Sequence, residues 1–182
     1  MRIISGNKRG MVLSTPEGLD TRPTSDRIKE TLFNMIAPDV YDCYFLDLFS
    51  GSGQMGIEAL SRGAREAIFV EKDKKALACI EANISKAKLS DVSSVYKEDV
   101  FSALNRLKHE VFDIIFMDPP YNKDIEKDVL SALSNKSYVG EDTLIIVEAS
   151  LETNLDYVSD MGYTIIKEKN YKTNKHIFIK KA

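Results

Sequence analysis

The residues best suited to carry chemistry are the run Asp118-Pro-Pro-Tyr121, which follows an apolar stretch at 112–117. Because that stretch predicts a buried strand, the run belongs at the carboxyl edge, where open α/β sheets bind ligands. Pro119 and Pro120 fix the backbone and donate no hydrogen bond, so the Pro119 carbonyl and the Asp118 carboxylate can accept from an amine. Tyr121 adds a ring for stacking on a planar base. We interpret the run as a site that orients an exocyclic base amine so that its nitrogen can receive a group in line from sulfur.

A glycine-rich loop lies upstream, in the run Leu46-Asp-Leu-Phe-Ser-Gly-Ser-Gly-Gln-Met-Gly56. Its glycines let the backbone turn sharply and let a ligand approach the unpaired N–H groups of the helix that follows. Glu71, 20 residues after the first of these glycines, can hold a ribose, and this spacing is shared with dinucleotide sites. Asp47 favours a cofactor with a cationic amino-acid end, because its carboxylate would repel a pyrophosphate.

A third acidic segment, Glu98-Asp99-Val100, follows the next strand pattern and falls on the same edge of the predicted sheet. Asp99 can accept a hydrogen bond from an adenine amine, or it can cap the helix that starts at Val100. The sequence favours neither role over the other.

Other chemistries do not fit the spacing of the residues. The segment Gly51-Ser-Gly53 is one residue short of a nucleophile elbow, and no Gly-Lys-Ser/Thr follows a phosphate loop. His109 and His176 are isolated and are interpreted as surface or packing residues, so no metal site is predicted. Cys43 and Cys79 lack metal-ligand spacing and sit within apolar patterns, which indicates reduced packing residues.

The elements that must position these residues alternate along the chain. From residue 43 onward, apolar β-branched runs alternate with helical patterns, which is typical of βα units around a parallel sheet. Strands are predicted at 43–49, 67–71, 92–96, 112–117 and 143–147. Helices are predicted at 54–62, 74–88, 100–108 and 124–133, and 151–161 forms the last crossover.

Both ends of the chain depart from this alternation. Strand-like runs at 163–169 and 176–180, joined by a polar turn at 170–174, predict an antiparallel hairpin whose lysines protect the sheet edge. An apolar stripe at 26–36 predicts a first helix, with Thr24 or Ser25 as its N-cap. The fold class is therefore α/β, a Rossmann-like and mostly parallel sheet with a C-terminal antiparallel hairpin and helices on both faces.

Composition indicates one soluble domain of 182 residues, with an N-terminal RNA-facing extension and first helix at 1–40 and a Rossmann-like core at 41–182. No apolar run is long enough to cross a bilayer and no secretory signal is present, so we expect a cytoplasmic protein. The net charge is −3, yet segments 1–30 and 167–182 each hold six Lys or Arg. If the termini meet, these segments form a basic face for phosphate, and otherwise they are ordinary solvated surface.

Taken together, the glycine loop, Glu71, Asp99 and the Asp118-Pro-Pro-Tyr121 run resemble the class I methyltransferases that act on amino nitrogens. Segments at 1–10, 22–34 and 57–64 extend the likeness over essentially the full length, and there the chain resembles the RsmD-type bacterial 16S rRNA guanine-N2 methyltransferases. This resemblance implies a seven-stranded sheet, S-adenosyl-L-methionine as methyl donor, and one guanine of the 16S rRNA or small ribosomal subunit as target.

The residues and the resemblance together give a predicted site. The cofactor would be held by Asp47, Phe49, Gly51, Gly53, Glu71, Lys72, Asp99 and Val100. The guanine amine would be held by Asp118, Pro119, Pro120 and Tyr121. RNA would be contacted by Arg9, Arg22, Thr24, Lys172 and Lys175. Ser50 and Gln54 depart from the resemblance, since small apolar residues are expected there.

Three alternatives are kept beside this interpretation. A DNA adenine-N6 methyltransferase uses a similar acceptor loop, but a sequence-specific one would be expected to carry a target-recognition insert that 182 residues leave no room for. An NAD-dependent oxidoreductase shares the glycine loop and Glu71 but gives no role to residues 118–121. A non-catalytic ribosome-assembly factor would keep the fold only to grip RNA, and the intact acceptor loop argues against it.

Overall fold

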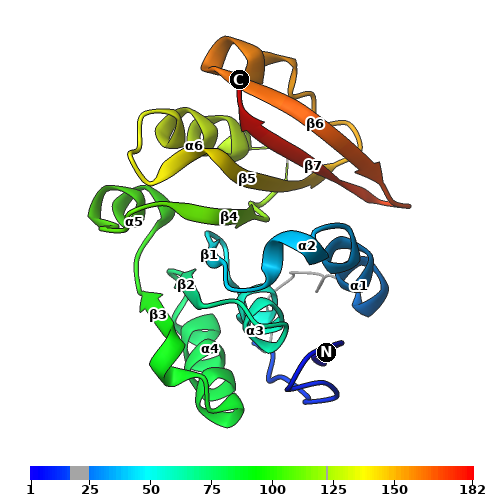
Figure 1. The fold of residues 1–182 in the computed structure, drawn as a ribbon, viewed down its shortest axis with the longest axis vertical. Helices are drawn as coiled ribbons and strands as arrows, with labels where there is room; N and C mark the ends of the chain where they lie inside the picture. The colour runs from blue at the N-terminus through cyan, green and yellow to red at the C-terminus, as the bar shows by residue number, and fades with distance from the viewer. Residues whose placement is uncertain (17–24, 122) are drawn as a thin grey trace.

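The computed structural model describes residues 1–16, 25–121 and 123–182. Arg22 and Thr24, two of the predicted RNA contacts, lie outside these ranges. The described strands form one seven-stranded sheet in the order β3-β2-β1-β4-β5-β7-β6, which runs from the bottom to the top of Figure 1. They are β1 (Tyr44–Asp47), β2 (Glu66–Val70), β3 (Ser93–Tyr96), β4 (Phe112–Met117), β5 (Val139–Ser150), β6 (Tyr163–Asn170) and β7 (Asn174–Lys181).

Helices cover both faces of this sheet (Figure 1). They are α1 (Asp26–Met35), α2 (Ala37–Val40), α3 (Gln54–Ser61), α4 (Lys74–Ala87), α5 (Val100–Arg106) and α6 (Ile125–Ser134), with 3-10 turns η1 (Ser90–Val92) and η2 (Asp156–Met161). One apolar cluster joins α1 to α4 with one face of the sheet, and a second joins α5, α6 and η2 with the other. Among the described residues, no helix has the length and apolar character that crossing a membrane requires.

The sheet has a parallel part and an antiparallel edge. β1 to β5 pair in parallel, and the central residues of β1, β2 and β4 are apolar and buried because helices cover both faces, whereas the edge strand β3 is only partly buried. β7 pairs antiparallel with β5 on one side and with β6 on the other. The predicted fold class, with its C-terminal antiparallel hairpin, is confirmed.

Several predicted boundaries were wrong for physical reasons. β5 reaches from Val139 to Ser150 because Val139 pairs with Phe112 of β4 and the second half of the strand pairs with β7 over six residue pairs, a partner that the local pattern does not reveal. The crossover at 151–161 contains only the 3-10 turn η2. α2, with Pro38 in its first turn, was not predicted. The start of α1, in contrast, was predicted correctly, because Ser25 is its N-cap and the Ser25 side chain accepts a hydrogen bond from the Ile28 N–H at 3.3 Å.

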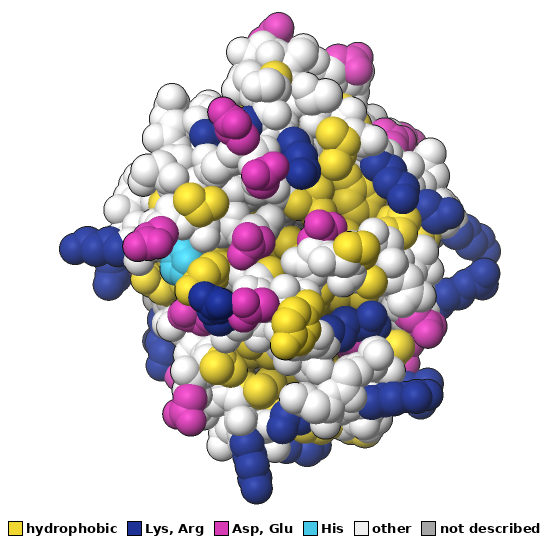
Figure 2. Space-filling view, in the orientation of Figure 1, with side chains coloured by type: hydrophobic (Ala, Val, Ile, Leu, Met, Phe, Trp, Pro, Cys, Tyr) yellow, Lys and Arg dark blue, Asp and Glu magenta, His cyan; other side chains and the backbone are white. Residues whose placement is uncertain are grey.

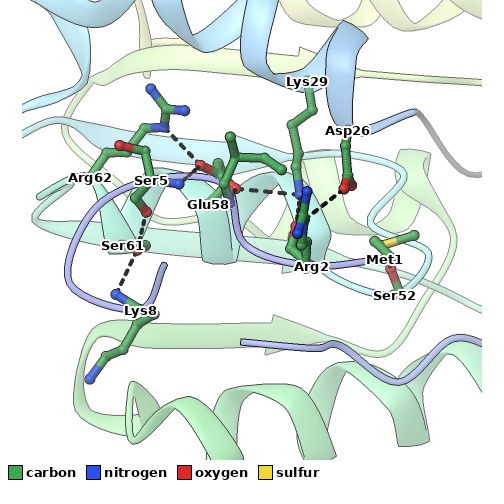
Figure 3. Close-up of polar contacts among 11 residues, drawn as sticks. Met1, Arg2, Ser5, Lys8, Asp26, Lys29, Ser52, Glu58, Ser61 and Arg62 are labelled. Carbon is green, nitrogen blue, oxygen red and sulfur yellow. Dashed lines mark hydrogen bonds and ion pairs between the residues drawn. The ribbon is translucent and has the colours of Figure 1, made fainter. Parts of the chain in front are cut away.

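The first thirteen residues fold back as a small hairpin. The Ile3 N–H donates to the Met11 carbonyl at 2.9 Å, and the Gly10 N–H donates to the Ile3 carbonyl at 2.8 Å. The turn of this hairpin rests on the end of α3, where Ser61 Oγ accepts from the Lys8 N–H at 2.9 Å (Figure 3). Gly6 is required there, because a Cβ at residue 6 would lie 1.7 Å from the Ser61 carbonyl oxygen.

Glu58 of α3 is the buried anchor of this hairpin (Figure 3). Its carboxylate accepts from the backbone N–H groups of Ile4 and Ser5 at 2.9 and 3.0 Å. It also pairs with Lys29 of α1 at 3.4 Å and with Arg62 at 2.8 Å. Because Lys29 and Glu58 are both fully buried, their charges must satisfy each other inside the protein. The first helix, the hairpin and α3 are therefore joined at one carboxylate.

Removing the charge of this anchor should destabilise the whole fold. We expect Glu58→Gln to lower the free energy of unfolding by about 3–5 kcal/mol, because the Lys29 ammonium would be left buried without its counter-charge. Urea unfolding followed by circular dichroism measures the change. Glu30→Gln, at an exposed position of α1, is the matched control and should stay within about 0.5 kcal/mol of the parent. Equal midpoints for the two variants would contradict the assignment.

Candidate functional site

Acidic side chains from neighbouring strands gather at the carboxyl edge of the sheet. Asp47 ends β1, Glu71 follows β2, and Asp118 follows β4. β1 pairs with both β2 and β4, so these three residues lie on adjacent parallel strands. The negative charge of Glu71 contributes to the raised pKa of Asp47, and that of Asp47 contributes to the raised pKa of Asp118. The structure thus brings together the acids of the glycine loop and of the Asp-Pro-Pro-Tyr run.

Asp47 is fully buried, and neither carboxylate oxygen accepts a well-formed hydrogen bond from the described residues. Burial, opposed by the Gly56 N–H and reinforced by the charge of Glu71, raises the pKa of this acid from 3.8 to about 7. A buried acid with only weak protein partners is costly, and a cationic ligand is the partner that would offset the cost. Asp47 is therefore a candidate to bind a positively charged group.

The glycine loop turns between β1 and α3 through left-handed backbone. Gly51 and Gly53 have φ values of +54° and +78°, and Gly53 is the N-cap of α3. Ser50, which departs from the resemblance, ties the loop to β2, because its Oγ accepts from the Val70 N–H at 3.0 Å and donates to the Asp47 carbonyl at 2.9 Å. The hydroxyl thus makes two bonds that a small apolar side chain could not make.

Glu71 closes over this loop from the end of β2. Its Oε2 accepts from the Gly51 N–H at 2.9 Å, and its Oε1 accepts from the N–H groups of Lys72 and Asp73 at 2.8 and 2.9 Å. These bonds fix the carboxylate and leave lone pairs that can accept from a diol. Lys72 itself is exposed.

Asp99 is the N-cap of α5, which was one of the two roles predicted for it. Its Oδ1 accepts from the N–H groups of Phe101 and Ser102 at 3.0 and 3.1 Å, and its Oδ2 accepts from Ser102 Oγ at 2.6 Å. Hydrogen bonds from Ser102 are the main cause of its lowered pKa. Capping does not exclude a ligand contact, so its place in the cofactor site stays a prediction, as do those of Phe49 and Val100.

The run from Asp118 to Tyr121 follows β4 as predicted. Asp118 is partly buried, and its pKa is raised well above the ordinary value by burial and then by the charges of Glu148 and Asp47. Pro119 is buried, whereas Pro120 and the Tyr121 ring are exposed. The run can therefore present acceptors and a ring to a ligand at this edge.

Sequence reasoning missed the polar residues that support this run. Glu148 near the end of β5 accepts from the Tyr121 hydroxyl at 3.1 Å, and His176 of β7 lies 3.0 Å from the other carboxylate oxygen. His176 is therefore not isolated, and its interpretation from the sequence was wrong because the β5–β7 pairing joins residues 28 positions apart. His109 does pack, between Tyr44 and Phe112. Of the cysteines, Cys43 is buried and Cys79 is partly buried, both free.

The predicted RNA contacts that lie within the described residues differ in exposure. Arg9 is exposed at the tip of the N-terminal hairpin, Lys172 is exposed in the turn between β6 and β7, and Lys175 is buried beside Glu168 at 3.5 Å. Figure 1 shows the N-terminus near α3 and the C-terminus at the opposite end of the molecule, so the termini do not meet. Lys29, counted among the basic residues of the first segment, is buried in the Glu58 anchor.

A hollow of about 480 Å³ lies between the end of α1 and the β6–β7 hairpin, with Leu144 and Phe178 among its lining residues. Figure 2 shows it as an apolar area bordered by Lys and Arg. Asp113 and Asp142 also line it, and they mark the amino ends of β4 and β5. The hollow is thus separate from the carboxyl edge and is not the candidate site.

The chain is similar to known proteins over nearly its whole length. Residues 1–180 match the family model described as conserved hypothetical protein 95. Identity is 41% over 167 residues to YlbH of Bacillus subtilis (strain 168), covering 90% of this chain and 91% of that protein. It is 35% over 169 residues to ribosomal RNA small subunit methyltransferase D of Escherichia coli (strain K12), covering 93% and 84%. The solved structure of yhhF from Escherichia coli has a TM-score of 0.88 at 33% identity and covers 100% of this chain and 97% of that one.

The raised pKa of Asp47 predicts a pH-dependent cost in stability. Because the folded pKa of about 7 exceeds the ordinary 3.8, the contribution of this acid is present at low pH and is lost as pH rises to 7. Relative to Asp47→Asn, the parent should lose about 2–3 kcal/mol of unfolding free energy between pH 5 and pH 8. Urea unfolding across this range measures it. Asp142→Asn, at an exposed acid of the opposite edge, should follow the parent, and parallel profiles for parent and Asp47→Asn would refute the burial argument.

Proposed function

Since this chain belongs to the ribosomal RNA small subunit methyltransferase D family, we propose that it transfers a methyl group from S-adenosylmethionine to the exocyclic N2 of a guanine in 16S rRNA. The observation that carries the proposal is the pairing of two features on adjacent strands. Asp47, buried without a partner, suits the cationic end of a cofactor, and the Asp118–Tyr121 run suits a base amine. The choice of guanine N2 rests on the family resemblance.

The residues present fit this cofactor. Asp47 would receive its ammonium group, Glu71 its ribose hydroxyls, and the loop at Gly51 and Gly53 would pass close to it without side chains in the way. Asp99, Phe49, Lys72 and Val100 remain proposed neighbours. When bound, the cofactor supplies an electrophilic methyl group on a sulfonium.

The chain's own residues would orient the base and take up its proton. The Asp118 carboxylate and the Pro119 carbonyl accept hydrogen bonds from the amine, which fixes the direction of its nitrogen lone pair. The Tyr121 ring stacks on the base once it has left its own stack. Because its pKa is raised, the Asp118 carboxylate holds a proton more strongly than an ordinary aspartate, so it can accept the one that the amine releases.

The observations weigh against the alternatives. A dinucleotide would bring its pyrophosphate to an edge where Asp47 and Asp118 are both acidic and poorly solvated, which disfavours an oxidoreductase. A sequence-specific DNA enzyme would need a recognition insert, whereas the described residues are nearly all used in the sheet, its helices and the N-terminal hairpin. An assembly factor that only grips RNA would have no use for a buried, unpartnered Asp47.

The RNA surface is proposed in outline. Arg9 and Lys172 are exposed and can contact phosphates at two separate points, with Arg22 and Thr24 as further contacts outside the described residues. Lys175 can take part only if its pairing with Glu168 opens. An rRNA substrate also implies a cytoplasmic protein.

Removing the acceptor carboxylate should abolish methyl transfer. We expect Asp118→Ala to lower kcat at least about 100-fold, because the amine loses one of its two acceptors at a poorly solvated edge. The assay follows labelled methyl from S-adenosylmethionine into small ribosomal subunits that lack the modification, and the RNA is then digested to nucleosides. Label in N2-methylguanosine with the parent, and its loss in the variant, would support reaction, substrate and site together.

Asp142→Ala, at the opposite edge of the sheet, is the matched control and should transfer like the parent. Label in duplex DNA but not in RNA would favour the DNA enzyme. Calorimetric binding of NAD in preference to S-adenosylmethionine would favour the oxidoreductase. RNA binding by the parent without any methyl transfer would favour the assembly factor.

Basic residues at the two proposed contact points should make RNA affinity depend on salt. The double variant Arg9→Ala, Lys172→Ala should bind small-subunit rRNA more weakly and reduce the slope of log affinity against log salt by about 1–2, because each neutralised phosphate adds roughly one unit to that slope. Filter binding at several salt concentrations measures the slope. Lys108→Ala, exposed just after α5, serves as control. An unchanged slope in the double variant would remove these residues from the RNA surface.

A further inference from the structure

Glu148 is a buried acid in β5, next to the base-binding run. Only 4% of its surface is exposed, and it pairs across the antiparallel ladder with His176 of β7. Its charge is the second cause of the raised pKa of Asp118 and of Tyr121, after burial. Glu148 therefore lies close to both residues proposed to handle the base, although no sequence motif marks it.

Three side chains converge on the Glu148 carboxylate. Oε1 lies 3.1 Å from the Tyr121 hydroxyl and 2.5 Å from Asn174 Nδ2, and Oε2 lies 3.0 Å from His176 Nε2. On the far side of the imidazole, the Tyr171 hydroxyl lies 3.1 Å from Nδ1. The carboxylate thus links the loop after β4 to the β6–β7 hairpin.

The directions of these bonds are mutually consistent. If the Tyr171 hydroxyl donates to His176 Nδ1, the neutral imidazole carries its proton on Nε2 and donates it to Glu148. Tyr121 and Asn174 can only donate to the same carboxylate. Ring contacts of His176 with Phe116 at 6.2 Å and with Tyr171 at 5.0 Å hold the imidazole in place. Tyr121, Asn174 and His176 therefore all donate to Glu148, and Tyr171 supports it through the imidazole.

Burying this carboxylate is hard to explain by stability alone. Well-packed apolar residues commonly stabilise a protein as much as a buried polar cluster does. Tyr121, in contrast, is 39% exposed on a loop, and its hydroxyl bond to Glu148 restrains the orientation of the ring. Hydrogen bonds to a charged acceptor are among the stronger ones in proteins.

From this geometry, and resting on the proposed function, we propose that Glu148 is a positioning residue that fixes the Tyr121 ring for stacking on the target base. Asn174 and His176 of β7 hold the carboxylate in the orientation that reaches the hydroxyl. The C-terminal hairpin is thereby part of the base-binding apparatus. Glu148 positions the base through Tyr121 and needs no contact with the substrate, in addition to the effect of its charge on the pKa of Asp118.

A double-mutant cycle tests this inference. Tyr121→Phe keeps the ring and removes the hydroxyl, and Glu148→Gln removes the charge, so each should lower kcat/KM for small subunits about 10- to 100-fold. The double variant should lose clearly less than the product of the two single losses, because both changes break the same bond, although Glu148→Gln also removes a charge that raises the pKa of Asp118. Affinity for S-adenosylhomocysteine, measured by calorimetry, should change less than about twofold in all three.

Controls separate positioning from general damage. Tyr163→Phe removes a buried hydroxyl that donates to the Leu130 carbonyl at 3.2 Å, and Glu66→Gln changes a partly buried acid at the start of β2. Both should transfer methyl like the parent. Asn174→Ala removes one donor to Oε1 and keeps the carboxylate, so it should lower kcat/KM in the same direction even if Glu148→Gln folds poorly.

The outcomes distinguish this inference from the proposed function. Methyl transfer by the parent, with losses in the two single variants that multiply in the double variant, would overturn the positioning role and leave the proposed function standing. Equal loss of cofactor affinity would also overturn it. If the parent transfers no methyl, the proposed function fails, and urea unfolding of the same four proteins still tests the contact, because additive stability changes would show that the Tyr121–Glu148 bond is absent.

Discussion

Carboxylates crowd the carboxyl edge of this sheet, where Asp47, Glu71, Asp118 and Glu148 come from four adjacent parallel strands. Like charges in poorly solvated surroundings repel, so such a cluster persists only if each member finds compensation. Glu71 finds it in three backbone N–H groups, and Glu148 in Tyr121, Asn174 and His176. Asp47 accepts no hydrogen bond of standard geometry among the described residues, and only weaker interactions such as that with the Gly56 N–H oppose the rise in its pKa. A cationic ligand, as proposed for this site, would supply the missing compensation.

Behind this edge, the supports of the glycine loop come from distant parts of the chain. Asn83 of α4 is fully buried, and its Nδ2 donates to the Ser52 and Ser14 carbonyls at 2.9 Å each. Glu58 holds the N-terminal hairpin and α1 against the other end of α3. The glycine loop is thus held directly by Asn83, and α3, which follows it, is held by Glu58. A site that is ordered before the ligand arrives loses less conformational entropy when the ligand binds.

The sequence was informative wherever one local pattern decides the outcome. Alternating apolar runs predicted the strands and helices, and the prolines at 119 and 120 marked the acceptor loop. Ser25 was one of two residues predicted as the cap from their place before an apolar stripe. Glu148 and His176 could not be connected, because only the register of β5 against β7 brings them together. Lys29 and Lys175 were counted as surface lysines, because the partner that pairs with each of them in the fold, Glu58 or Glu168, cannot be identified from the local sequence.

The order of strands in the sheet also constrains the order of events in folding. β6 precedes β7 in the chain but lies outside it in the sheet, so β6 is attached to the sheet only through β7, whether the two strands pair with each other before or after β7 pairs with β5. Until β7 has paired with β5, strand edges at this end of the sheet are open, and open edges favour pairing between molecules. The composition of β6 disfavours such pairing, because Tyr163 is its only buried residue and three of the others are charged. The pairing of β7 with β5 also brings Asn174 and His176 to Glu148, so the hydrogen bonds that support Glu148 form when the antiparallel hairpin joins the sheet.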